Sequence, residues 1–181
     1  MNGPAGTLRL SRRPPPPIAN GRLGMMLLVG TETVLFACFI SAYMILRMGA
    51  GTWPPAGTPH LTLGLSSVNT AILVISSLIL MTRKRIRHAA CFGLGSLFLL
   101  LQGVEFHRLY AQGLTLQTGP YGAVFYSLVG LHGFHVLGGL GFLLYLLFGI
   151  QNPPQRKKYA EMYWHFVTVV WLVLFSILYL I

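Results

Sequence analysis

The sequence predicts an all-α membrane protein, a bundle of five transmembrane helices. Of the 181 residues, 54% are hydrophobic and only 9% are charged, whereas soluble domains carry about 25% charged residues. The apolar residues gather in five runs, each long enough for a membrane crossing of about 20 residues, and polar or glycine- and proline-rich segments separate them. A chain this poor in charge cannot cover a water-exposed surface, which excludes a soluble globular domain.

The chain divides into a short tail and one helical unit. Residues 1–21 are predicted to form a basic, proline-rich cytoplasmic tail, because the run from Pro14 to Pro17 favours an extended chain. Residues 22–181 are predicted to form the bundle. The predicted helices follow the apolar runs and cover about residues 23–46, 61–81, 88–110, 121–150 and 159–181.

Positive charge is distributed unevenly between the segments that flank the helices. Eleven of the thirteen Lys and Arg residues lie at the N-terminal end and in the loops after the second and fourth runs, whereas Arg47 and Arg108 lie on the other side. Cytoplasmic loops of membrane proteins carry such an excess of positive charge. We therefore expect a cytoplasmic N-terminus and a periplasmic C-terminus at Ile181. The same distribution explains the net charge of +10, so no nucleic acid is expected as a partner.

Glu32 interrupts the first apolar run, about 15 Å from the cytoplasmic end of its predicted helix. An ionisable group at this depth is costly and is a functional candidate by default. Two interpretations are open. Glu32 is either a proton-handling or lipid-contacting carboxyl, or a neutral glutamate that is hydrogen-bonded between helices.

His132 and His135 share one face of the fourth predicted helix because they are three residues apart. A metal site would need further ligands and outer-shell support. We therefore expect interhelical hydrogen bonds from the two histidines, one of them to Glu32. The sequence predicts no catalytic residue, cofactor-binding residue or metal ligand in this chain.

Further polar candidates lie on the other helices. Asn69 lies on the second, and Glu105 lies near the outer end of the third. Glu161, His165 and Thr168 form one polar stripe on the fifth, because they are spaced at i, i+4 and i+7. We expect these side chains to pack helices together.

Five segments, in this order, resemble the helices of subunit III of cytochrome c oxidase and its quinol-oxidase relatives. They are Gly24–Phe36 with Glu32, Ser67–Leu73 with Asn69-Thr70, Leu101–Phe106 with Gln102 and Glu105, Tyr121–Val136 with His132 and His135, and Tyr163–Leu172 with Trp164-His165-Phe166. The resemblance covers about residues 22 to 181. It departs from the family pattern at Thr168, where the family carries Asp.

The resemblance implies the short, five-helix bacterial form of this haem-copper oxidase subunit, a multi-pass protein of the bacterial cytoplasmic (inner) membrane. It implies an accessory, non-catalytic subunit of a proton-pumping terminal oxidase, a complex that reduces O2 to water in aerobic respiration. Haem and copper are expected in partner subunits. The expected partners are subunit I as the main contact, subunit II, other oxidase subunits and phospholipid.

The family likeness also implies specific roles. The chain is expected to stabilise subunit I, to support proton uptake and to bind phospholipid in a cleft. Glu32 matches the carbodiimide-reactive intramembrane carboxyl of the family. Two alternatives are a subunit III-like protein of a nitric oxide reductase system, and a small proton-coupled transporter that uses Glu32 and the histidines. Genes for oxidase subunits I and II beside this one would exclude the first, and an absence of flux in proteoliposomes would exclude the second.

Overall fold

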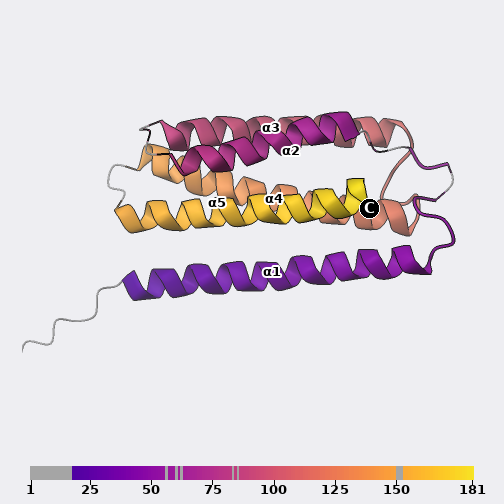
Figure 1. The fold of residues 1–181 in the computed structure, drawn as a ribbon, viewed down its shortest axis with the longest axis horizontal. Coiled ribbons are helices and arrows are strands. Elements are labelled where there is room, and N and C mark those ends of the chain that lie inside the picture. Colours follow the sequence, from indigo (N-terminus) through magenta and orange to yellow (C-terminus); the bar gives the residue numbers. More distant parts are fainter. Residues whose placement is uncertain are drawn as a thin grey trace, which may run out of the picture.

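The computed structural model describes residues 18–55, 57–59, 61, 63–82, 84, 86–149 and 153–181. This part of the chain contains helices and loops but no strand, and its long helices run side by side (Figure 1). The elements are α1 Ile18–Gly49, α2 Leu63–Leu80, α3 Arg87–Ala111, α4 Pro120–Phe148, α5 Pro154–Phe175 and one π-helical turn, η1 Ser176–Leu180. Five helices among the described residues are long and apolar enough to cross a membrane. The predicted five-helix bundle is therefore confirmed.

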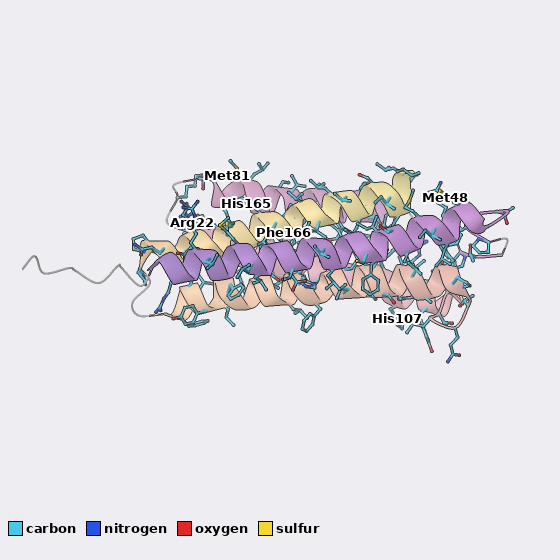
Figure 2. The ribbon with its side chains drawn as sticks, turned by 90° about the horizontal axis from the view of Figure 1, so that it is seen from below. Arg22, Met48, Met81, His107, His165 and Phe166 are labelled. Atoms are coloured by element: carbon cyan, nitrogen blue, oxygen red, sulfur yellow. The ribbon has the colours of Figure 1, made fainter. Side chains whose placement is uncertain are left out.

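Successive helices run in opposite directions, so the bundle has two distinct ends. Figure 2 places Arg22 and Met81 at one end, with Met48 and His107 at the other. We call the first the basic end, because α1, α3 and α5 begin there with Arg22, Arg87 and the segment 156–158. We call the second the far end; α1 and the chain itself end there.

Four helices form the compact part of the bundle, and α1 lies at its edge (Figure 1). The contacts run between α2 and α3, α3 and α4, α4 and α5, and α2 and α5, whereas α1 packs mainly on α4 and α5. The core is apolar and combines aliphatic with aromatic side chains. Its completely buried side chains include Leu73, Phe98, Phe125, Leu128, Leu143, Trp164 and Trp171.

Two tryptophans of α5 hold α2 in place. The indole nitrogen of Trp171 donates to Thr70 Oγ1 at 2.9 Å, and that of Trp164 donates to Ser76 Oγ at 3.0 Å. Trp164 fits because α3 and α4 present glycines to it. A Cβ atom added at Gly95 would overlap the indole ring, and one added at Gly139 would lie 2.9 Å from Trp164 Cε3. Small residues let these helices approach closely.

The structure corrects several predicted helix boundaries. α1 begins at Ile18 rather than at about residue 23, and α5 begins at Pro154 rather than at about residue 159. The end of the predicted tail therefore belongs to α1, and residues 1–17 lie outside the described residues. Apolar runs mark only the hydrocarbon-embedded part of a helix, whereas the helix itself continues into the polar interface. Pro154 is suited to the first helical position because its φ angle is already helical. α4 ends at Phe148, before Gly149, rather than at residue 150.

Candidate functional site: the Glu32–His135 pair

The shortest polar contact between α1 and α4 joins Glu32 to His135. Glu32 Oε2 and His135 Nε2 are 2.5 Å apart, and the two side chains are 19% and 8% exposed. The contact forms because α1 packs against α4. The interhelical hydrogen bond expected for Glu32 is therefore present, and His135 makes it.

The second ring nitrogen of His135 fixes the proton count of this pair. Nδ1 lies 2.7 Å from the Leu131 carbonyl oxygen, one turn earlier on α4. A carbonyl oxygen can only accept, so Nδ1 carries a proton. The contact with Glu32 then needs one more proton, which lies either on the carboxyl, donating to Nε2, or on Nε2, donating to a carboxylate. Low-dielectric surroundings penalise the second form, because it separates charge. Either way, Glu32 and His135 share one proton.

Aromatic side chains enclose the His135 side of the pair. The Phe36 ring meets the His135 ring edge-on with centroids 5.1 Å apart. Tyr163, from α5, donates a long hydrogen bond of 3.5 Å to the His135 carbonyl. Helices α1, α4 and α5 thus meet at His135. Among the described residues, its two ring nitrogens bond Leu131 and Glu32.

His132 differs from the prediction. Neither of its ring nitrogens has a hydrogen-bond partner among the described residues, although the side chain is only 1% exposed. The ring instead stacks on Trp171, with centroids 4.9 Å apart, and meets Phe98 edge-on at 6.0 Å. The prediction of an interhelical hydrogen bond from His132 is wrong, because the position of this residue on α4 points its ring into the aromatic core.

The polar stripe of α5 faces α2 and α3. Glu161 accepts hydrogen bonds from Arg87 at 2.6 Å and from His88 Nε2 at 2.9 Å. His165 Nδ1 lies 2.6 Å from Ser77 Oγ. The Thr168 hydroxyl, by contrast, donates to the Trp164 carbonyl of its own helix at 3.0 Å. Glu161 and His165 therefore tie helices together as predicted, and Thr168 fills a buried position without an interhelical bond that the structure records.

Asn69 and Glu105 lie in the far half of the bundle, apart from Glu32. The Asn69 amide donates to Gln102 Oε1 at 3.2 Å, which ties α2 to α3. Glu105 is 2% exposed and forms an ion pair with Arg108 at 3.7 Å. The sequence-predicted candidates thus separate into three groups: the Glu32–His135 pair, the stripe of α5 and a polar group between α2 and α3.

Sequence reasoning missed the partners of Glu161. In the sequence, Arg87 belongs to the positive charge that follows the second apolar run, and residue 88 is only the predicted start of the third helix. The sequence nevertheless indicates that Glu161 has a basic partner. Of the three acidic residues, Glu161 alone lies beside one of the basic segments that flank the apolar runs. A lone carboxylate among many cations at the same membrane depth is expected to bind one of them. Arg87 also donates to the Leu80 and Thr82 carbonyls, which caps the C-terminal end of α2.

Metal-binding geometry is not evident in the part of the chain that the structure describes. It contains no group of three or more His, Cys, Asp or Glu side chains that could hold a metal ion. His132 and His135, the only closely spaced histidines inside the bundle's described helices, face different neighbours.

Comparison with known proteins identifies the family. The profile of the family described as cytochrome c oxidase subunit III matches residues 16–181. The chain is 37% identical to cytochrome c oxidase subunit 3 of Synechocystis sp., over 87% of this chain and 74% of the relative. It is 34% identical to cytochrome c oxidase subunit 3 of Bacillus subtilis, over 89% and 86% of the two chains. It is 33% identical to the probable cytochrome c oxidase subunit 3 of Nocardia farcinica, over 88% and 87%. The family profile matches nearly the whole sequence, and the matched region contains five helices long and apolar enough to span a membrane. This multi-pass membrane protein therefore belongs to the cytochrome c oxidase subunit III family.

Proposed function

We propose that the chain is the accessory, non-catalytic subunit III of a proton-pumping haem-copper terminal oxidase, in which it stabilises subunit I and supports proton uptake. Haem and copper belong to the partner subunits, with subunit I as the main contact. The observation that carries the proposal is the Glu32–His135 pair, which holds a shared proton inside a membrane-spanning bundle.

The proposed location is the bacterial cytoplasmic membrane, with the basic end in the cytoplasm. Arg22, Arg87 and the segment 156–158 lie at the basic end, whereas Arg47 and Arg108 lie at the far end. The positive-inside rule assigns the more basic side to the cytoplasm. Glu32 then lies on the cytoplasmic half of α1, where a group that supports proton uptake is useful.

Phospholipid binding is supported by a pocket at the basic end. It has a volume of about 730 Å³ and lies between α1, α4 and α5, with Met25, Gly138, Phe142 and Tyr159 among its lining residues. Arg156 also lines it and donates to the Tyr145 hydroxyl at 2.5 Å. Apolar walls suit acyl chains, and a guanidinium suits a phosphate.

The proton role is tested with Glu32→Gln and Glu32→Ala in the purified oxidase complex. The Gln amide can still donate to His135 Nε2, so we expect this variant to assemble, but it cannot pass on a proton. Proton uptake and activity during sustained turnover should therefore fall, while the initial rate of O2 reduction stays near that of the wild type. Glu32→Ala should in addition weaken assembly. Thr33→Ala is the control, because the one partner of the Thr33 hydroxyl among the described residues is the Val29 carbonyl of its own helix. Wild-type proton uptake and turnover in Glu32→Gln would refute the proton role.

The accessory role is tested by co-purification in mild detergent. The chain should elute with a haem-containing subunit and show no haem absorbance when separated from it. Stoichiometric haem or copper on the isolated chain would contradict the proposed non-catalytic status.

A further inference from the structure

Polar side chains gather in the far half of the bundle, between α2, α3 and η1. Ser66 and Asn69 lie one turn apart on α2, and Gln102 and Glu105 lie one turn apart on α3. All four are at most 7% exposed. Together with Tyr179 of η1, we call them the far polar cluster.

Two amide atoms of the far polar cluster lack a protein partner. Asn69 Oδ1 and Gln102 Nε2 are buried, and neither has a hydrogen-bond partner among the residues that the structure describes. The Phe98 carbonyl fixes the orientation of Asn69, since it can only accept and lies 3.3 Å from Asn69 Nδ2. An unmet buried donor or acceptor costs about 1–3 kcal/mol. One acceptor beside one donor matches a water molecule, which donates to the first and accepts from the second.

The Tyr179 hydroxyl supplies a third unmet group. It is buried and makes no hydrogen bond of ordinary length and angle within the described ranges of the chain. The side chains of Ser66 and Gln102 lie close enough to act on it as longer hydrogen-bond partners, and a water between these groups would give each a contact of ordinary geometry. Buried waters typically make about three hydrogen bonds. Asn69, Gln102 and Tyr179 together can provide them.

A pocket at the far end reaches the same tyrosine. It has a volume of about 210 Å³, and its lining includes Tyr43, Trp53, Tyr121 and Tyr179. The Tyr121 hydroxyl is also buried and unpaired with respect to the described residues. One water takes about 30 Å³ of liquid volume, so the pocket has room for several. Tyr179 belongs to the far polar cluster and also lines the pocket, so it links the two.

An aromatic layer separates the far polar cluster from the Glu32–His135 pair. Trp171 stacks on His132, and Phe98 meets Trp171 edge-on with centroids 5.0 Å apart. Phe98 precedes Gln102 by about one turn on α3, and His132 lies about one turn from His135 on α4. The layer therefore lies between the two polar sites and keeps them separate.

We propose that the far polar cluster is a binding site for ordered water, continuous with the far-end pocket and closed toward Glu32 by the aromatic layer. The water is held by Asn69 Oδ1, Gln102 Nε2 and the Tyr179 hydroxyl. This inference goes beyond the proposed function, because it depends neither on a proton role of Glu32 nor on the orientation of the chain.

The binding site is tested by an electron cryo-microscopy map of the oxidase complex that contains this chain, at a resolution that shows ordered waters elsewhere in the membrane region. We expect a density peak within hydrogen-bond distance of both Asn69 Oδ1 and Gln102 Nε2. A map that resolves other internal waters but none here, or that shows the two atoms bonded to protein groups, overturns the site.

The connection to the pocket is tested by X-ray hydroxyl-radical footprinting of the same complex, because radicals formed from bound water oxidise the rings beside it. Tyr121 and Tyr163 are a matched pair, at 2% and 5% exposure. Only Tyr121 lines the far-end pocket. We expect Tyr121 to be oxidised several-fold faster than Tyr163. Equal rates show that the pocket holds no water beside Tyr121 and so overturn its proposed continuity with the water site, whether or not the proposed oxidase function holds.

Discussion

At the scale of single residues, two histidines one turn apart on α4 have different surroundings. His135 bonds Glu32 and Leu131, whereas His132 packs its ring against Trp171 and Phe98. A buried polar group without hydrogen-bond partners destabilises the folded state, so an apolar ring of the same shape can replace it with little loss of stability. The two positions should therefore respond differently to the same substitution.

We expect His132→Phe to change the free energy of unfolding by less than about 1.5 kcal/mol, since the ring stack is kept. His135→Phe should destabilise by about 1–3 kcal/mol, because it leaves the Glu32 carboxyl without its partner. Thermal or denaturant unfolding of the purified chain in detergent measures both. Equal losses in the two variants would mean that the Glu32–His135 bond contributes little to stability.

The pairing of Glu32 with a histidine could be predicted from the sequence, but the choice between His132 and His135 could not. Both lie on one face of α4, and their depths differ by only three residues, roughly 4.5 Å along the helix axis. Which ring meets α1 depends on the rotation and tilt of two helices. These are set by packing, here by Phe36 and Trp171, and do not show in the spacing of polar residues.

At the scale of the elements, the close contact of α3, α4 and α5 depends on glycine. We expect Gly95→Ala to destabilise by about 1–3 kcal/mol, because the added methyl group overlaps the Trp164 indole. Gly103→Ala on the same helix is the control: its Cβ would meet nothing within 4 Å, so the higher helix propensity of alanine should stabilise by up to about 1 kcal/mol. Unfolding of the isolated chain in detergent compares them. A Gly95→Ala variant as stable as Gly103→Ala would show that Trp164 moves aside freely.

The loop between α2 and α3 is held by Arg87, which bonds two carbonyls at the end of α2 as well as Glu161 of α5. Both charged side chains are partly exposed, 25% for Arg87 and 21% for Glu161, so their coupling energy should be about 1 kcal/mol or less. We expect Arg87→Ala to cost more than Glu161→Ala, because only the former uncaps α2. A double-mutant cycle on unfolding free energies separates the two terms. If Glu161→Ala cost more than Arg87→Ala, the contact between Glu161 and His88 would contribute more to stability than the capping of α2 by Arg87.

At the scale of the whole molecule, the sequence predicts the number of helices but not their arrangement. Composition alone makes Gly21–Gly49 an ordinary membrane span, with a hydropathy of 2.0 that is the highest of the five. In the bundle, 6% of its most apolar window is buried, against 28–39% in the other spans. Apolar side chains are stable against lipid as well as against protein, so hydropathy cannot distinguish a peripheral helix from a central one.

Since α1 packs mainly on α4 and α5, the Glu32–His135 bond should be a principal restraint on its position. Spin labels at two exposed positions, Met48 on α1 and Leu116 after α3, report the distance between α1 and the rest, with Cys38→Ser and Cys91→Ala as the background. We expect Glu32→Ala to broaden this distance distribution and Glu32→Gln to leave it narrow, because the Gln amide still bonds His135.

The control pair, Met81 and Phe148, joins α2 to α4 at the basic end and should be unaffected by either substitution. Broadening of both pairs would mean that Glu32 stabilises the bundle as a whole, and no broadening in Glu32→Ala would mean that apolar packing alone positions α1.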